Sequence, residues 1–433
     1  MIRQTFRSLG YRNYRLFFIG QGTSLIGTWM SRTAVAWLVY RLTDSSLALG
    51  LLAFSASAPA FLLSPVAGVL ADRWNRHRVL MATQSLLMLQ AVFLALLVLS
   101  NRVELWHILL LSFIRGLLNT LDAPLRQAMV VELVDNRQDL GNAIALNSSM
   151  FNGARFIGAS LAGILIGLYD EGVCFMINAI SFVVILGCLA AMRIQFIGPY
   201  QKPRTVWREV KDGFVYVSGF VPIRDLLLFL GGTIFVTAPF MVYRPIIARD
   251  ILQAGPEALG FLTTASGIGA LCGALHLASR RDVLGLDRVL LLAATIFALG
   301  LIGLSQSRYL SLSLMIMFAA GFGQINLVAS INTLLQTMTE DRMRGRVMSL
   351  YHQAKLGAAT GGGLIAGSLG DLLGPTMVLF LAGIACLGAG LLFARRLPYL
   401  RKMTRPLYIE KGIVTESSPG LQETTEPIEI QRL

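Results

Sequence analysis

Long apolar segments, separated by short polar connections, follow one another along almost the whole chain. A helix that crosses the hydrocarbon core of a membrane needs about 20 mostly apolar residues. Segments of this kind lie near residues 14–40, 47–71, 79–100, 104–124, 140–168, 172–192, 225–248, 257–279, 288–307, 309–337, 346–370 and 375–395. The pattern predicts an all-α polytopic membrane protein with twelve transmembrane helices.

The composition agrees with this prediction and excludes a soluble protein. Of the 433 residues, 55% are hydrophobic and 14% are charged, whereas a soluble globular chain carries about 25% charged residues. The first apolar run, from Leu16 to Tyr40, is longer than the apolar core of a cleavable signal peptide, which has about 7–15 residues. It is therefore predicted to be the first membrane span.

The basic residues predict the orientation. If the N-terminus is placed inside the cell and the spans alternate, 28 of the 37 Lys and Arg fall in inside loops, four in outside loops and five within spans. Such an asymmetry is typical of cytoplasmic loops. Both termini are thus predicted to be cytoplasmic, and the formal net charge of +13 requires no nucleic-acid partner.

A polar stretch in the middle of the chain divides the spans into two sets of six. We expect an N-terminal six-helix bundle over residues 1–192, a cytoplasmic linker over 193–224, a C-terminal six-helix bundle over 225–397 and a partly disordered cytoplasmic tail over 398–433. Within the linker, Val206 to Val217 reads as an amphipathic surface helix. The tail ends in an acidic stretch, Thr415 to Glu429, whose composition favours disorder.

The second half repeats features of the first. With an offset of 210 residues, Asp72 matches Asp282 and Arg78 matches Arg288, and a second offset aligns the glycine-rich fifth and eleventh spans. Small residues let helices approach closely, so these spans are expected to form sliding surfaces. Two repeated bundles joined by a linker are the architecture of secondary transporters, whose halves move around a site at their interface.

The loop after the second span carries a motif. Gly68-Val-Leu-Ala-Asp72-Arg73-Trp-Asn75-Arg76-His77-Arg78 resembles the signature G-x-x-x-D-R-x-G-R-R of the major facilitator superfamily. A carboxylate at the C-terminal end of a helix opposes the helix dipole, so Asp72 should pair with a cation in one state and release it in another. The predicted gating residues are Gly68, Asp72, Arg73, Arg76, Arg78, Asp282 and Arg288.

Further segments resemble one branch of that superfamily, the enterobactin-exporter-like group. They are Arg12–Phe18, Gly27–Met30, Leu42–Ser46, Asp122–Ala128, Asn152–Gly158 and Arg344–Tyr351. The resemblance extends over about residues 5–400 and implies an exporter, with proton antiport as the candidate coupling. One position departs from it, because Ala159 follows Gly158 where antiporters of the superfamily often carry Pro.

Charged side chains inside spans are costly and usually face a cavity or a partner. Five basic residues lie within spans, and helical spacing groups them with polar neighbours; Thr28 and Ser24, for example, precede Arg32 at four-residue steps. The predicted substrate-binding residues are Arg32, Arg115, Asn119, Asn152, Arg155, Gln324, Asn326 and Lys355. Alternatively, Arg32 and Arg244 extend to the membrane surface, and Arg115 and Arg155 are structural cations.

No Asp or Glu lies near the middle of a predicted span. A cavity with basic groups and no central carboxylate should favour anionic or electron-rich ligands over cationic drugs. Asp122, near a cytoplasmic end, and His352, whose side chain can titrate near neutral pH, are the candidates for proton coupling.

Other function classes lack their characteristic residues. No Lys follows a phosphate-binding glycine loop, and the four Cys and four His show no metal-ligand spacing. We therefore expect no enzyme, no metal and no cofactor, but a monomeric exporter in the bacterial inner membrane that moves a small amphiphilic or anionic molecule, siderophore-like or drug-like, by alternating access. The alternatives are a facilitator or symporter that imports a metabolite, and multidrug efflux of uncharged or cationic compounds.

Overall fold

A computed structural model describes residues 6–73, 75–134, 136–193, 206–280 and 283–410, apart from the side chains of 65–73, 206–210 and Glu410. These residues are almost entirely helical. The first half comprises η1 (Arg7–Gly10), α2 (Arg12–Thr43), α3 (Ser46–Arg73), α4 (Arg76–Leu99), α5 (Leu105–Glu132), α6 (Arg137–Leu168) and α7 (Glu171–Ala190). The remainder comprises α8 (Val206–Gly219), α9 (Val221–Val236), α10 (Pro239–Val242), α11 (Arg244–Ile246), η2 (Ile247–Ile251), α12 (Pro256–Ala278), α13 (Leu286–Gln306), α14 (Leu310–Met338), α15 (Arg344–Leu373) and α16 (Pro375–Glu410).

All twelve predicted spans are helical. Ten segments in the described part of the chain are long and apolar enough to cross a membrane. The two predicted spans outside this set, α2 and α15, have 32 and 30 residues but are more polar. Both carry charged residues that were predicted to bind substrate, Arg32 and Lys355 respectively, and such residues lower the hydropathy of a span.

The seventh span is interrupted rather than continuous. α9 ends at Val236, and two short helices and a π-helical turn lead to Ile251. Pro239 and Pro245 explain the break, because a proline lacks the amide hydrogen and clashes with the carbonyl one turn earlier. The Thr237 hydroxyl donates to the Thr233 carbonyl at 2.7 Å, where the regular pattern stops.

The twelfth helix is longer than predicted, because it continues beyond residue 395 into the segment that was assigned to the tail. α16 continues through Pro398 and Pro406 to Glu410. Leu400 and Thr404 are buried, and the Arg401 Nε lies 2.5 Å from an Asp287 carboxylate oxygen. These contacts offset the cost of prolines within a helix. The predicted disordered stretch Thr415–Glu429 lies outside the described residues.

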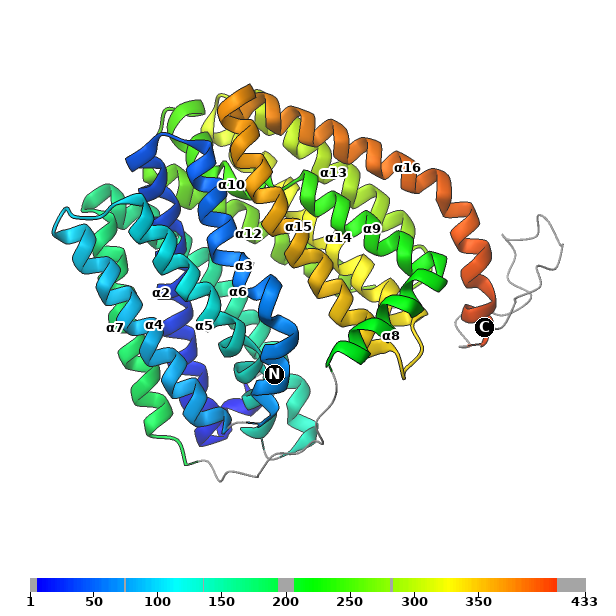
Figure 1. Ribbon diagram of the computed structural model, residues 1–433, viewed down its shortest axis with the longest axis horizontal. Helices are drawn as coiled ribbons and strands as arrows, with labels where there is room; N and C mark the ends of the chain where they lie inside the picture. The colour runs from blue at the N-terminus through cyan, green and yellow to red at the C-terminus, as the bar shows by residue number, and fades with distance from the viewer. Residues whose placement is uncertain (1–5, 74, 135, 194–205, 281–282, 411–433) are drawn as a thin grey trace.

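Two groups of helices stand side by side (Figure 1). α2 to α7 form one group and α9 to α16 the other, with α6 packed on α12 and α3 on α15 across the boundary. The beginning of α2, the end of α16 and α8 lie toward the same end of the molecule, the lower side of Figure 1. We call this the terminus end and the opposite one the far end. The predicted linker helix is confirmed as α8, which packs on α15.

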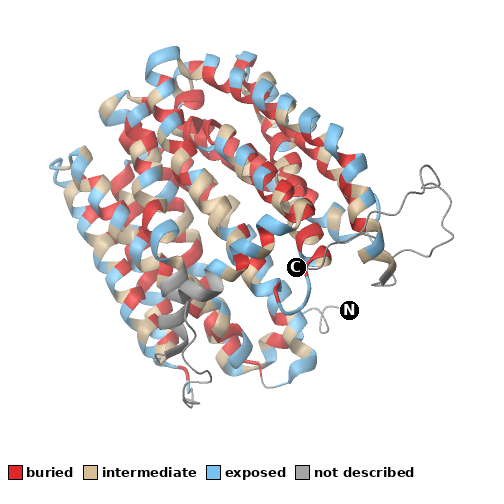
Figure 2. Cartoon of the chain, turned by 45° about the vertical axis from the view of Figure 1, so that its right-hand side comes forward, coloured by how far each residue is buried: buried red, intermediate tan, exposed pale blue. Residues whose placement is uncertain are grey.

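The buried apolar residues show where the two groups join. One cluster unites both groups, for example Tyr40 and Leu49 with Tyr243 and Leu259. Two other clusters each belong to a single group, and they include Tyr14 in the first and Leu226 in the second. Exposed residues alternate with buried ones along the outer helices (Figure 2), so each helix has one face toward the protein and one face outward.

Glycines allow the closest approaches between the groups. A Cβ on Gly163 of α6 would lie 2.8 Å from the Pro256 carbonyl oxygen at the start of α12. A Cβ on Gly50 of α3 would lie 2.9 Å from the Cα of Gly367 in α15. The glycine-rich fifth and eleventh spans thus each contact a helix of the opposite group, as small residues permit.

Candidate binding site

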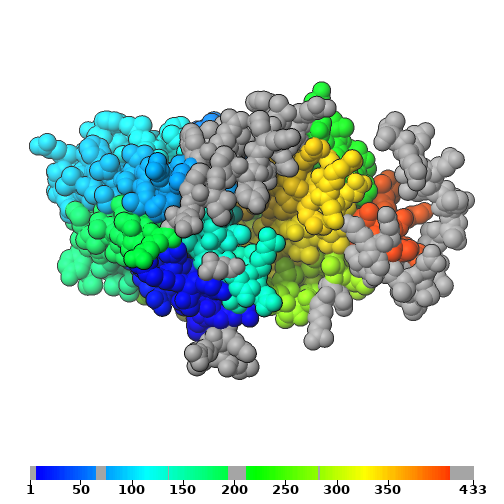
Figure 3. Space-filling view, turned by 90° about the horizontal axis from the view of Figure 1, so that it is seen from below, coloured from blue at the N-terminus to red at the C-terminus, as the bar shows by residue number. Residues whose placement is uncertain are grey.

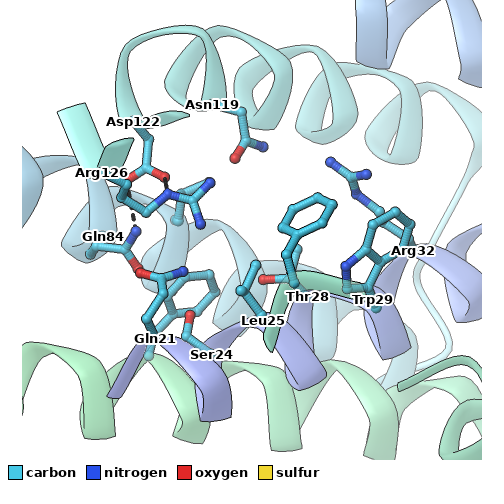
Figure 4. Close-up of a pocket in the computed structure, with 13 residues that line it drawn as sticks. Gln21, Ser24, Leu25, Thr28, Trp29, Arg32, Gln84, Asn119, Asp122 and Arg126 are labelled. Atoms are coloured by element: carbon cyan, nitrogen blue, oxygen red, sulfur yellow. Dashed lines mark hydrogen bonds and ion pairs between the residues drawn. The ribbon is translucent and has the colours of Figure 1, made fainter. Parts of the chain in front are cut away.

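A cavity opens among α2, α4, α5, α6 and α7 of the first group (Figure 4). One face of α2 contributes Gln21, Ser24, Thr28 and Arg32, which follow each other at three- or four-residue steps and therefore line up on the helix. The remaining lining residues come from the same helix or from its neighbours: Leu25, Trp29, Gln84, Leu87, Asn119, Asp122, Arg126, Phe151 and Phe182. The polar stripe predicted on the first span is thus confirmed as a wall of a cavity.

Trp29 gathers two of the predicted arginines. The Arg32 guanidinium lies 4.8 Å from the Trp29 ring centroid and that of Arg155, from α6, lies 5.5 Å from it. Guanidinium groups are attracted to the face of an indole ring, so Trp29 holds two like charges near each other. The Arg155 Nε is buried without a hydrogen-bond partner among the described residues, which leaves donor capacity unused.

Further arginines extend this positive region. Arg115 and Arg126 of α5 are near enough to Arg32 for their charges to repel it, and Arg155 is near enough to repel Arg244. Arg244 is 7% exposed, lies 4.9 Å from the Phe240 ring centroid and points a nitrogen at the Ser266 hydroxyl, 3.4 Å away. Arg244 is therefore buried inside the protein and does not extend to the surface.

One carboxylate lies among the residues that line this cavity, and it is fully occupied. Asp122 is 1% exposed, and its oxygens are 2.7 Å from the Arg126 Nε, 2.7 Å from the Gln84 amide nitrogen and 3.1 Å from the Thr83 hydroxyl. The dashed lines in Figure 4 show part of this network. Asp122 thus pairs with Arg126, and the ion pair drawn in Figure 4 involves neither Arg115 nor Arg155.

Sequence reasoning missed Arg126 because it placed the end of the fourth span at residue 124. The structure continues α5 through Pro124 to Glu132, so Arg126 lies within the helix rather than in a loop. Its distance of four residues from Asp122 was the available signal, because side chains four apart meet on a helix.

The other predicted binding residues are placed differently. Asn119 and Asn152 each donate to the carbonyl four residues earlier, at 2.9 Å, and Asn119 lines the cavity. Gln324 is half-buried. Asn326 is 1% exposed, and its amide oxygen lies 3.2 Å from the Nδ1 atom of His276. Asn326 therefore lies within the packed contact of α12 and α14.

His352 and Lys355 of α15 lie near a common tyrosine. The His352 ring stands edge-on to Tyr351 with centroids 5.2 Å apart, and the Lys355 ammonium lies 5.9 Å from the centroid of the same tyrosine. His352 is exposed and Lys355 is half-buried. Both belong to the second group of helices and neither lines the cavity of the first.

Polar contacts across the two groups gather at the far end. The Asp371 carboxylate of α15 accepts from the Ser45 hydroxyl at 2.8 Å and from the Ser46 backbone N–H at 2.6 Å, at the start of α3. Asp44 and Arg249 form an ion pair of 2.5 Å, and the Tyr40 hydroxyl donates to Asp250. Sequence reasoning missed these contacts because their partners are 205 to 326 residues apart.

The predicted gating residues Arg76, Arg78 and Arg288 lie at the terminus end, where α4 and α13 begin. Asn75 caps α4 by accepting from the Arg78 N–H at 3.1 Å, and Arg76 pairs with Glu132 of α5. Arg288 lies in the first turn of α13, next to Asp287, which is paired with Arg401. Gly68 lies within α3, while the side chains of Asp72 and Arg73, and all of Asp282, lie outside the described residues.

Comparisons with known proteins all point to membrane transport proteins. The sequence profile described as "Transmembrane secretion effector" matches residues 4–407. The staphyloferrin A transporter of Staphylococcus aureus is 24% identical over 88% of this chain and 95% of its own. The enterobactin exporter of Shigella boydii is 26% identical over 90% of this chain and 92% of its own. A crystal structure of a point mutant of the nucleoside transporter NupG superposes with a TM-score of 0.71, covering 89% of this chain and 98% of that one, at 12% identity.

Proposed function

This chain belongs to the transmembrane secretion effector family of the major facilitator superfamily, and on that premise we propose that it exports a small anionic molecule by alternating access. It is an integral membrane transporter and not an enzyme. The observation that carries the proposal is the cluster of arginines around Trp29, next to a cavity whose lining carboxylate is already paired. The proposed binding residues are Arg32, Arg115, Asn119, Asn152 and Arg155, with Gln324 and Lys355 on the opposite helices.

The charge balance of the cavity supports an anion. Like charges held close together inside a protein are costly unless a counter-charge neutralises them. Asp122 already pairs with Arg126 and accepts two hydrogen bonds, so it adds little neutralisation for Arg32 or Arg155. A bound carboxylate or catecholate would supply the missing charge, and guanidinium groups bind such oxygens in pairs. A cationic drug would add to the repulsion.

The family and its named relatives support outward transport of a siderophore-like molecule. One relative is named as an exporter of enterobactin and another as a transporter of staphyloferrin A. We transfer only the shared chemistry, which is a small molecule rich in anionic oxygens. The alternatives are import of a metabolite, and efflux of uncharged or cationic compounds.

The positive-inside asymmetry supports placing the terminus end in the cytoplasm. The N-terminal and C-terminal bundles, residues 1–192 and 225–397 in this proposal, are joined at the far end in the present conformation. The cavity would then be closed toward the outside, which is the state in which an exporter loads its substrate. Asp72, Arg73, Arg76 and Arg78 would close the terminus end in the opposite state.

The Asp122–Arg126 pair bears on energy coupling. Its carboxylate is the proposed proton carrier for antiport, the coupling that the resemblance implies, and His352 is the second candidate. A proton that enters in exchange for the anion would move a positive charge inward while a negative charge moves outward. The membrane potential, negative inside, itself drives an anion outward by about 2.3 kcal/mol per charge per 100 mV.

A substrate screen tests the proposal. Bacterial cells that express or lack the protein would be loaded with siderophore-like anions, cationic dyes and macrolide-like drugs, and efflux would be followed over time. We expect faster efflux of at least one anion and no change for the permanent cations. Preferential efflux of cations would reject the anion proposal, and faster entry of an anion would favour the import alternative.

The contact of Asp371 with the start of α3 is proposed to hold the far end closed, and a substitution tests this role. Asp371→Ala removes an acceptor that joins α15 to the start of α3, and a hydrogen bond to a charged group contributes about 1.5–3 kcal/mol. We expect the closed far end to become at least tenfold less populated and turnover to fall several-fold, measured as transport per inserted protein.

Asp170→Ala is the matched control. Like Asp371, Asp170 accepts a hydrogen bond from a backbone N–H at the start of a helix, that of Val173 at 3.0 Å. Asp170 and Val173, however, belong to the same group of helices. We expect it to lower stability without changing the far-end closure. Equal effects of the two substitutions on turnover would show that Asp371 is an ordinary helix cap.

A further inference from the structure

A second cavity lies at the terminus end of the second group, away from the arginines around Trp29. It is enclosed by α9, α13, α14 and α16. Its apolar wall is formed by leucine, methionine, phenylalanine and valine side chains: Leu226, Val283, Leu284, Leu334, Met338, Phe393, Leu397 and Leu400. The part of α16 beyond Pro398, which composition alone placed in a polar tail, supplies Leu400 and Tyr408 to this wall.

The rim of this cavity is basic. Arg288, Arg401 and Arg405 line it, and Asp287 is the one acid among its lining residues. Arg401 and Arg405 are four residues apart and therefore lie on the same face of α16. Asp287 is engaged by Arg401 and by the Arg288 N–H at 2.9 Å. Three arginines and one acid thus line the mouth of an apolar cavity.

The position of the cavity matches the chemistry of its lining. α13 begins and α14 ends here, next to the extension of α16, so the cavity lies where spans reach a membrane surface. Figure 3 views the molecule from this end. Basic pockets between membrane helices at a cytoplasmic surface suit anionic lipid headgroups, and an apolar wall of this kind suits an acyl chain.

We propose that this cavity binds one phospholipid with an anionic headgroup. The phosphate would lie among Arg288, Arg401 and Arg405, and an acyl chain would lie against Leu334 and Leu397. A zwitterionic phospholipid carries a compensating positive charge, which the three arginines would repel. A soluble phosphate lacks the chain that fills the apolar wall. The site is independent of the proposed transport substrate.

Native mass spectrometry of the full-length, detergent-solubilised protein tests this proposal with three probes: phosphatidylglycerol, phosphatidylcholine and glycerol 3-phosphate. We expect one phosphatidylglycerol to be retained at concentrations at which phosphatidylcholine is lost. The double variant Arg288→Gln, Arg405→Gln should lower that retention at least tenfold. Glycerol 3-phosphate should not displace the lipid.

Arg15→Gln is the matched control, because Arg15 is exposed at the same end of the molecule but lies in the first group. It should retain the lipid like the wild type. Thermal unfolding without added lipid verifies that the double variant is folded; if it is not, each single variant replaces it. Equal retention by the double variant and the wild type, or equal retention of the two lipids, would overturn the proposal. Displacement by glycerol 3-phosphate would assign the site to a soluble phosphate instead.

Discussion

Replacing Arg155 by alanine is expected to lower the affinity for an anionic substrate by ten- to about a hundredfold, since a hydrogen bond to a charged group contributes about 1.5–3 kcal/mol. Arg155 lies against Trp29 with its Nε buried and without a hydrogen-bond partner among the described residues. Arg155→Lys should also bind at least several-fold more weakly. An ammonium keeps the charge but reproduces neither the two-pronged donor geometry nor the stacking of a guanidinium.

The measurement is substrate affinity in solubilised wild type, Arg155→Lys and Arg155→Ala at equal folded fraction. Arg137→Ala serves as the control, because Arg137 is exposed at the first turn of the same helix, α6. Wild-type affinity in both Arg155 variants would remove this residue from the binding site and leave Arg32 and Arg115 to carry the proposal. Full rescue by lysine would identify Arg155 as a positive charge without a specific geometry.

Gly163→Val is expected to reduce transport more than tenfold while leaving the protein inserted in the membrane. The new side chain would meet the backbone of α12, with the Pro256 carbonyl oxygen and the Glu257 Cα within 2.8 and 3.0 Å of its Cβ. Backbone atoms cannot move aside as a flexible side chain does, so α6 and α12 must separate. The far end would then fail to close, and the transport cycle would stop.

Cross-linking reports this closure directly. Cysteines introduced as Asp44→Cys and Arg249→Cys replace an ion pair that joins the two groups, and they should cross-link in an otherwise wild-type chain. Gly163→Val should abolish the cross-link. Gly153→Val is the control: it lies in the same helix and bears the same change in helix propensity, but nothing lies within 4 Å of its Cβ. Cross-linking that persists in Gly163→Val would mean that the helices adjust without opening.

The fold followed from the sequence wherever one strong signal dominates. A run of about 20 apolar residues has few alternatives to a membrane helix, and all twelve predicted segments are helical. The ends of helices were less predictable. α16 continues for more than ten residues beyond its apolar run because Leu400 and Thr404 pack against other helices, and such tertiary contacts leave no mark on local hydropathy.

The sequence allowed single residues of the candidate site to be predicted, but not how these residues are arranged in space. The cost of an intramembrane charge singled out Arg32 and Arg155, yet nothing in the sequence indicates that Trp29 lies between them. Asn326 shows the opposite limit. Its polarity made it a candidate for substrate binding, whereas the structure places it against His276 between two helices. A buried amide needs a hydrogen-bond partner whether or not it binds a substrate.

Transport into inside-out membrane vesicles, with a potassium diffusion potential of either sign, tests the central claim most directly. In such vesicles export appears as uptake, and a lumen-positive potential reproduces the electrical force that acts on an anion in the cell. The account predicts that this potential accelerates uptake of an anionic substrate, that Arg155→Ala abolishes the uptake, and that a permanent cation is not taken up. Accumulation of a permanent cation, or uptake of the anion that ignores the potential and survives Arg155→Ala, would contradict it.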